Sequence, residues 1–182
     1  MRSERGFTLI ELLVVMVIIG VIIAGAILSF GSIGQDRQLE DERDRLVALM
    51  NYAREQADLQ TRELGLYCTQ DGYRFLAFDP QKNLWVDVQE DDALRPRTLP
   101  SGLQIQLSVE SHDVVLKTAA ADSKQKQDPK DLIPHVMIFS NGDLSSFQLT
   151  LERVGTDHAA VLLPDDQDNI IQRPAPAPEN RA

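Results

Sequence analysis

Two features close to the N-terminus could take part in chemistry: the Gly6–Phe7 peptide bond and the carboxylate of Glu11. Glu11 precedes Leu12–Phe30, a run that has no charged residue and is apolar along most of its length. A carboxylate inside a membrane helix costs about 2.5–3.5 kcal/mol on insertion scales, so such a residue normally has a partner. If the chain is cut between Gly6 and Phe7, Phe7 gains an α-amino group one helical turn from Glu11. The two charges could then pair within one chain, or between neighbouring chains at one axial offset.

The apolar run allows three interpretations. Arg2 and Arg5 precede it, as in a secretory signal peptide, but it is long for such a peptide and Ala24–Ala26 is a poor match to a cleavage site. As a helix it would measure about 28 Å, which fits an uncleaved anchor whose N-terminus stays in the cytoplasm. That second interpretation leaves Glu11 unexplained. The third, cleavage before Phe7, accounts for both the span and the carboxylate.

The stretch RGFTLIEL at residues 5–12 resembles the class III signal of type IV pilins and type II secretion pseudopilins. That signal has a short basic leader, a Gly, a Phe and a Glu five residues into the mature chain, and an apolar helix follows. The resemblance covers residues 1–30. It implies that a prepilin peptidase cleaves the leader, residues 1–6, after Gly6 and methylates the amine of Phe7. It also implies that Glu11 acts in assembly, and that residues 7–30 form the transmembrane and assembly helix.

The resemblance further implies a place and a set of partners. The chain would lie in the bacterial inner membrane with a single pass, with its short N-terminus in the cytoplasm and its C-terminal domain in the periplasm. Its partners would be the prepilin peptidase, inner-membrane lipid, and the major and minor pseudopilins of the same system.

The rest of the chain has the composition of one acidic, folded domain. About 150 residues remain beyond the apolar run, which is enough for a single core. The net charge is −10, with 43% hydrophobic residues. An acidic domain repels phosphate backbones, so we expect no nucleic-acid partner. The single cysteine, Cys68, excludes an internal disulfide, and we expect it to be a small core residue.

Beyond residue 35, helical periodicity resumes and predicts an amphipathic helix. Its charged residues at 40–45 are expected to form a solvated face. We predict one helix from about Thr8 to Leu64, with Gly65 as its stop and with the part at 31–64 continuing into the periplasm. The predicted core stripe of this helix consists of Leu39, Leu46, Leu49, Met50, Ala53 and Ala57.

After Gly65 the hydrophobic period changes to two, which predicts a β-rich domain over 65–164. We predict a meander of three strands, then further strands, a mobile loop at about 117–133, and a disordered acidic, Pro-rich tail at 165–182. The fold class is therefore α+β: a long N-terminal helix packed on an antiparallel, two-sheet, pilin-like domain. The predicted strands are 66–69, 73–78, 84–88, a short pairing near Thr98, 103–109, 114–116, 135–139, 147–151 and 159–163.

The strands Val136–Phe139 and Phe147–Leu151, joined by Ser140–Asp143, are predicted to form a hairpin. This pattern is similar to the C-terminal hairpin of H-type minor pseudopilins, the GspH/FimT-like group. It implies a structural subunit near the tip of a short periplasmic filament that drives folded proteins across the outer membrane. The alternative is a FimT-like minor pilin that acts in pilus assembly or DNA uptake. DNA binding needs a basic stripe, and the tail carries only Arg173 and Arg181.

No group of residues has the spacing of a catalytic or metal site. The acidic tail residues could suggest calcium, but they lack the glycine and the terminal glutamate of a calcium loop. The histidines are scattered, and no Gly-x-Ser-x-Gly elbow is present. We therefore expect no enzyme activity, no cofactor and no metal. The residues considered are Asp165, Asp166, Asp168, Asn169, His112, Asp113, His135 and His158.

Overall fold

The computed structural model describes residues 9–124, 132–165 and 169–174, apart from the side chains of 24–36, 122–124 and 173–174. The chain divides into two compact units, Met1–Arg37 and Gln38–Ala182. One helix, α1 (Leu9–Gln60), begins in the first unit and ends in the second. The strands all belong to the second unit.

Helix α1 ends four residues before the predicted end at Leu64, and Gly65 is not its stop. Thr61 adopts a left-handed conformation with φ 48°, and its N–H donates to the carbonyl of Asp58 at 3.2 Å. The Arg62 N–H donates to the carbonyl of Ala57 at 3.0 Å. These two bonds form a Schellman-type end, which glycine normally provides. Because threonine rather than glycine occupies the left-handed position here, no residue type marks the true end of the helix in the sequence.

The first sheet, sheet A, confirms the predicted meander. Its strand order is β3-β2-β1-β7, all antiparallel, and the short β4 pairs with the start of β2. A one-turn 3-10 helix, η1 (Asp92–Leu94), lies between β3 and β4. The strands of sheet A are β1 (Leu64–Thr69), β2 (Gly72–Asp79), β3 (Leu84–Asp87), β4 (Arg97–Thr98) and β7 (Val136–Ile138).

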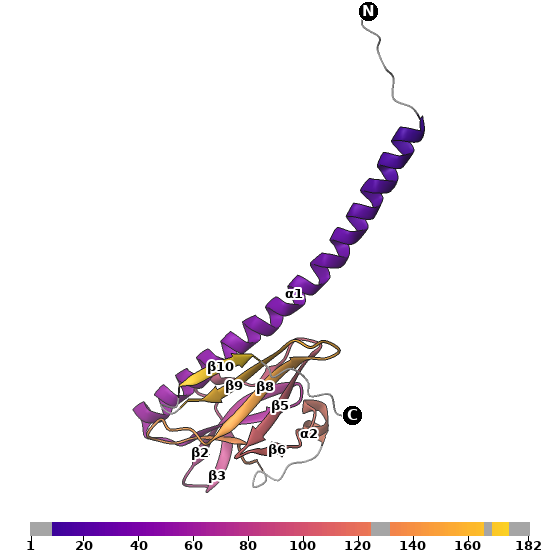
Figure 1. The fold of residues 1–182 in the computed structure, drawn as a ribbon. Coiled ribbons are helices and arrows are strands. Elements are labelled where there is room, and N and C mark those ends of the chain that lie inside the picture. Colours follow the sequence, from indigo (N-terminus) through magenta and orange to yellow (C-terminus); the bar gives the residue numbers. More distant parts are fainter. Residues whose placement is uncertain (1–8, 125–131, 166–168, 175–182) are drawn as a thin grey trace, which may run out of the picture. The chain divides into compact units, whose positions relative to one another are not determined.

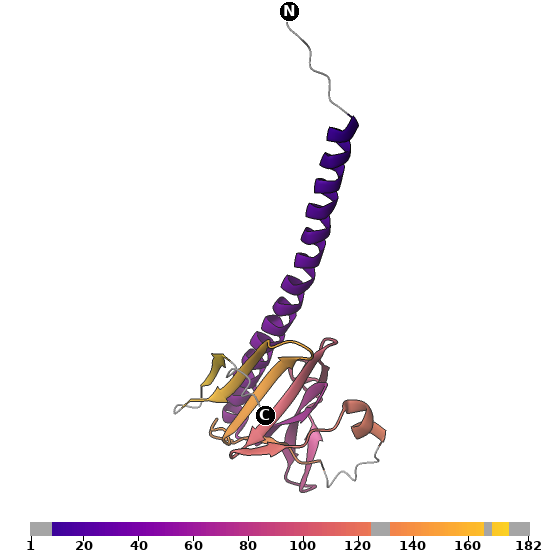
Figure 2. The same ribbon diagram turned by 45° about the vertical axis from the view of Figure 1, so that its right-hand side comes forward.

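The second sheet, sheet B, has the antiparallel order β10-β9-β8-β5-β6. Figure 1 shows these five strands side by side, with β2 and β3 in the other layer. The turned view in Figure 2 shows the same layer with the short helix α2 (Ala119–Lys124) off its edge. The strands of sheet B are β5 (Leu103–Val109), β6 (His112–Val114), β8 (Phe147–Arg153), β9 (Ala159–Pro164) and β10 (Ile170–Pro174).

The core joins the two sheets with the second half of α1. All six residues of the predicted helix stripe are buried in it. In sheet B, every second residue of β5 and β8 faces inward, with Ile105 paired opposite Leu151 and Leu107 opposite Leu149. The helical and strand periods read from the sequence therefore identified the buried faces correctly.

The predicted hairpin between Val136 and Leu151 is wrong. Strand β7 pairs with β1 in sheet A, whereas β8 pairs with β5 and β9 in sheet B. The turn itself forms: Gly142, with φ 82°, donates its N–H to the carbonyl of Phe139 at 2.9 Å. A single bridge between Ile138 and Leu144 follows, and the chain then crosses to the other sheet. A local turn signal cannot show that the next strand has a better partner in β5.

Two further expectations differ from the structure. The predicted disordered tail contains β10, which pairs with β9 along its whole length and buries Ile170 to 8% exposure. The predicted mobile loop contains α2, whose Ala119 N–H donates to Asp71 Oδ1 at 2.6 Å. In both cases a short segment with apolar or small residues lies within a polar stretch and is held by a contact distant in sequence: β10 pairs with β9, and α2 is bonded to Asp71. The remainder of the predicted loop and tail lies partly outside the described residues.

Gly65 has a packing role in β1. A Cβ atom built on it would lie 2.4 Å from Pro134 Cβ and 2.6 Å from Pro134 Cγ. Strand β1 is also the central partner of both β2 and β7. Glycine therefore allows the 132–135 segment to approach the sheet.

We predict that Gly65→Ala lowers the free energy of unfolding by about 1–3 kcal/mol, as overpacked sites do. Urea unfolding of the full chain in detergent would measure this change. Gly20→Ala is the matched control, since a Cβ there meets nothing within 4 Å, and alanine favours a helix. An equal effect of the two substitutions would contradict the packing role of Gly65.

Candidate assembly site

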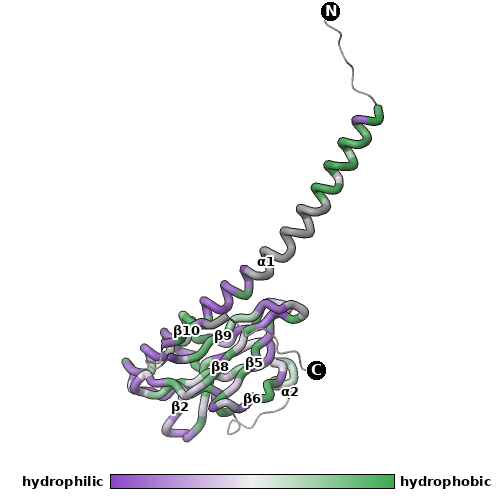
Figure 3. The backbone as a smooth tube through the Cα atoms, viewed as in Figure 1, coloured by the Kyte–Doolittle hydropathy of each residue, from purple (hydrophilic) through white to green (hydrophobic). Residues whose placement is uncertain are grey.

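The first turns of α1 present an apolar surface to their surroundings. The large hydrophobic side chains of Leu9–Ile23 are all exposed, from 42% for Val15 to 82% for Leu9. In Figure 3 this part of α1 is mainly green, whereas its last turns are largely purple. Such a length of exposed apolar surface on one helix is unfavourable in water, so it marks a surface that lipid or other helices must cover.

Glu11 lies in the first turn of α1, as predicted, and is exposed within this apolar surface. A carboxylate in the first turn is favoured by the partial positive charge of the helix N-terminus. Gly6 and Phe7 lie outside the described residues, so the structure places Glu11 but not its predicted partner. Across the described residues, no helix has an apolar stretch long enough to span a membrane. The predicted span Leu12–Phe30 lies partly beyond the side chains that are described.

The second half of α1 carries a buried acid that the sequence analysis assigned to the solvated face. Glu42 is only 2% exposed. Its Oε1 accepts a hydrogen bond from the Tyr73 hydroxyl of β2 at 2.7 Å, and its Oε2 accepts from Arg45 Nη1 at 2.5 Å. The helical spacing does predict this burial, since Glu42 is three residues after Leu39 and four before Leu46. It therefore falls on the buried stripe.

Further polar contacts attach α1 to the β-domain. Arg54 Nε donates to the carbonyl of Gly142 at 2.8 Å. The Tyr52 hydroxyl donates to Asp91 Oδ2 at 2.7 Å, which raises the pKa of Tyr52, chiefly through that bond. Arg153, itself buried, donates to Gln38 Oε1 at 3.3 Å. The helix is thus fixed to the turn at 140–143, to η1 and to sheet B.

Burial sets the protonation of two core side chains. Desolvation raises the pKa of the Cys68 thiol to about 12, which keeps it neutral and poorly nucleophilic. Burial, followed by the hydrogen bond to Glu42, raises the pKa of Tyr73 well above its ordinary value. Cys68 is therefore a core residue, as predicted, and Tyr73 stays a hydrogen-bond donor to Glu42 throughout the physiological range.

Where the structure describes them, the residues weighed for metal or catalytic roles do not gather into one site. His112 is exposed at the start of β6, and the rings of His135 and Tyr67 stack with their centroids 4.6 Å apart. Asn169 donates its backbone N–H to Asp165 Oδ1 at 2.8 Å. Asp166 and Asp168 lie outside the described residues. Among the His, Cys, Asp and Glu side chains that are described, no group could hold a metal ion.

Two family models match the chain, and together they cover most of it. The model of the prokaryotic N-terminal methylation motif matches residues 1–27. The model of the type II transport protein GspH matches residues 42–179. The first therefore contains Gly6, Phe7 and Glu11, and the second contains Glu42 and both sheets.

Relatives and solved structures agree with these matches. The chain is 37% identical to type II secretion system protein H of Pseudomonas aeruginosa over 166 residues, covering 91% of this chain and 93% of the relative. It is 29% identical to protein H of Aeromonas hydrophila, covering 86% of each. The fold resembles the minor pseudopilin EpsH of Vibrio cholerae, with TM-score 0.63, 15% identity and coverage of 76% and 97%. Escherichia coli GspH gives TM-score 0.55, 20% identity and coverage of 81% and 94%.

We predict that Tyr73→Phe lowers the free energy of unfolding by about 1.5–3 kcal/mol at pH 7, because a buried carboxylate loses a donor. The pKa of Tyr73 is raised on folding, so its contribution is present below its ordinary value of 10.0 and is lost as the pH rises above it. The difference between wild type and Tyr73→Phe should therefore shrink above about pH 10. Urea unfolding over a pH series would measure both effects.

Glu42→Gln completes a double-mutant cycle with Tyr73→Phe. A coupling energy of about 1 kcal/mol or more between the two positions is expected, since the side chains are in direct contact. Additive effects of the two substitutions would show that the bond does not stabilise the fold.

Proposed function

We propose how this chain, which belongs to the GspH family and is a minor pseudopilin of the type II secretion system, joins the pseudopilus. The contact surface is that of Leu9–Ile23, with Glu11 near its start. The exposed apolar side chains of this segment are the observation that carries the proposal. The β-domain buries a core of its own, and these side chains are exposed in the first unit. We place the subunit near the tip of the periplasmic pseudopilus, where it helps drive folded proteins across the outer membrane.

The chain is processed at Gly6–Phe7 in this proposal. The match of residues 1–27 to the N-terminal methylation motif supports cleavage by a prepilin peptidase between Gly6 and Phe7, and methylation of the Phe7 amine. The leader carries Arg2 and Arg5, which favour a cytoplasmic N-terminus. The domain that follows α1 then lies in the periplasm, and lipid of the inner membrane covers the apolar turns before assembly.

Glu11 sets the axial position of the subunit. In a low-dielectric environment an unpaired carboxylate is costly, whereas a paired one holds a defined place. The α-amine of Phe7 on a neighbouring subunit is the cation that this arrangement supplies. The partners of the assembled protein are therefore the major and minor pseudopilins of the same system.

The role is structural rather than enzymatic. Support comes from the relatives, which are named type II secretion system protein H, and from the likeness in fold to EpsH, which is named a minor pseudopilin. The alternative, a FimT-like minor pilin in pilus assembly or DNA uptake, has less support. Its DNA-binding role needs a basic surface, and the net charge here is −10. Retention of DNA by the protein at physiological salt would favour that alternative.

Gly6→Val should block leader removal, because a β-branched side chain does not fit where the leader needs glycine. Mass spectrometry of the membrane-extracted protein should then find Met1 at the N-terminus, and a methylated Phe7 in the wild type. An intact Met1 in the wild type would overturn the processing step.

Glu11→Ala should leave leader removal and membrane insertion intact, since it removes the carboxylate together with its insertion cost. Cross-linking to the other pseudopilins and secretion of exoproteins should both fall strongly, because the axial offset is no longer fixed. Glu11→Asp, which keeps the charge, is the matched control and should retain part of both. Normal cross-linking by a fully cleaved Glu11→Ala protein would show that Glu11 does not set the register.

A further inference from the structure

Sheet A has an open edge at β3. Among the described strands, β3 pairs with β2 on one side and with none on the other. Open edges attract further strands, and natural proteins keep them short or charged to limit this. β3 is four residues long, and Lys82 flanks it. This edge therefore has partial protection against indiscriminate pairing.

The hydrogen-bond pattern shows which backbone groups of β3 face outward. The N–H of Val88 donates to the carbonyl of Phe75 at 3.2 Å. Antiparallel ladders alternate, so Val86, which pairs with Ala77, also turns its N–H and C=O toward β2. The intervening residues, Trp85 and Asp87, turn theirs away from the sheet. Their N–H and C=O groups are in place to pair with a further strand.

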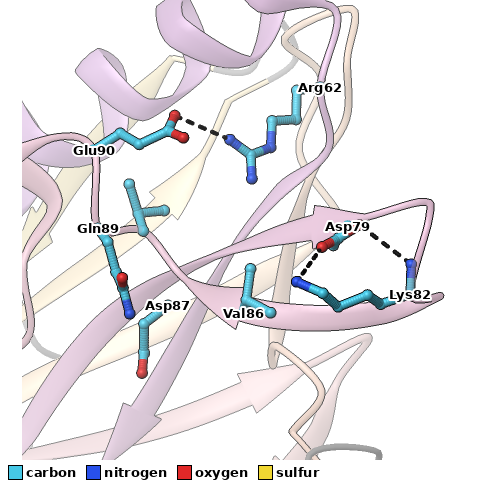
Figure 4. A pocket seen from close by; sticks show the side chains of 8 residues that line it. Arg62, Asp79, Lys82, Val86, Asp87, Gln89 and Glu90 are labelled. Carbon is cyan, nitrogen blue, oxygen red and sulfur yellow. Dashed lines mark hydrogen bonds and ion pairs between the residues drawn. The ribbon is translucent and has the colours of Figure 1, made fainter.

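A hollow of about 330 Å³ lies beside this edge, and Arg62, two residues beyond the end of α1, is one of its lining residues. Figure 4 shows Val86 facing into it, with Arg62 and Glu90 on one side and Lys82 and Asp79 on the other. Val88 also lines it. Because side chains alternate along a strand, Val86 and Val88 share one face and give the hollow an apolar floor.

Two cations and three carboxylates line the hollow, and the cation nearest to the third carboxylate, Arg74, lies outside the lining. Each carboxylate faces a cation: Asp79 and Lys82 are 3.0 Å apart, Glu90 and Arg62 3.8 Å, and Asp87 and Arg74 3.8 Å. A strongly charged ligand of either sign therefore gains little here. A strand on the edge of β3 would direct every second side chain into the hollow, where apolar side chains would meet the two valines.

Building on the proposed function, we propose that the edge of β3 accepts an extended segment of another pseudopilin as an added strand. The segment is uncharged over the pairing residues and has apolar side chains at alternate positions. Backbone bonds to Trp85 and Asp87 would supply affinity, and the hollow would supply selectivity. The occupant is thus a strand-forming segment of a neighbouring subunit rather than a helix or a small ligand.

The test uses the full chain in cells that contain the other pseudopilins of its system. A photoreactive amino acid is placed at Gln89, which lines the hollow, or at the exposed Gln104 of sheet B as a control. A third position, Val17, reports assembly through α1. The cross-linked peptides are identified by mass spectrometry. We expect Gln89, but not Gln104, to capture an apolar-alternating segment of another pseudopilin.

The backbone contribution is tested with Asp87→Pro and Asp87→Ala. Both remove the carboxylate, but only proline removes the outward N–H, and it leaves the ladder bonds of β2 in place. We expect proline to lower the Gln89 cross-link about tenfold relative to alanine, since a backbone bond is lost and its acceptor is left buried. Thermal unfolding shows whether the proline variant folds; if it does not, the Gln89 and Gln104 cross-links alone decide.

Equal yields for the proline and alanine variants would overturn strand addition, as would capture of a helical segment at Gln89. Capture of a pseudopilin at Val17 without capture at Gln89 would overturn this inference and leave the proposed function standing. Capture at neither position would overturn both.

Discussion

The hydrogen bond from Tyr73 to Glu42 fixes how the second half of α1 lies on sheet A. A helix held to a sheet by apolar contacts alone can shift by a turn and still bury most of its area, because such contacts are not directional. A desolvated carboxylate cannot shift in this way, since it would leave its donors behind. The contacts of Arg54 with Gly142 and of Tyr52 with Asp91 then form at their places along the same helix. The placement of the helix on the two sheets depends on this buried acid.

The two parts of α1 therefore have opposite distributions of apolar and charged side chains. Leu9–Ile23 presents apolar side chains outward, with Glu11 as its single charge among the described positions, whereas the turns beyond Gln38 present charges outward and an apolar stripe inward. Each part contains one carboxylate that is expensive in isolation. Glu42 finds its donors within its own chain, whereas the proposed donor of Glu11 lies on a neighbour. The same physical rule thus accounts for the fold in one half and for the proposed assembly contact in the other.

Periodic features could be predicted from the sequence, and features that depend on distant partners could not. The spacing of Leu46, Met50 and Ala53 identified the buried helix face, whereas the assembly role of Glu11, implied by the class III signal, stays a prediction. Glu42 was missed because residue type was given more weight than its position on that face. The helix end at Thr61 has no glycine, and the turn at Ser140–Asp143 resembles that of a hairpin although its strands pair elsewhere. Strand β10 follows an acidic stretch, and the local composition does not predict that it pairs with β9.

The crossing of the chain from β7 to β8 has a consequence for folding order. Sheet A is incomplete until β7, at residues 136–138, reaches β1, and the centre of sheet B is missing until β8 reaches β5. Neither sheet can close on the first two thirds of the chain. Pairings this distant in sequence form slowly, because closing the long loop between the strands costs entropy before the stabilising contacts between them can form. A chain emerging N-terminus first would therefore present β1 and β5 with an unpaired edge each until its last third arrived. During that interval the unpaired strand edges could pair with other chains and cause aggregation, so chaperones would have to shield them.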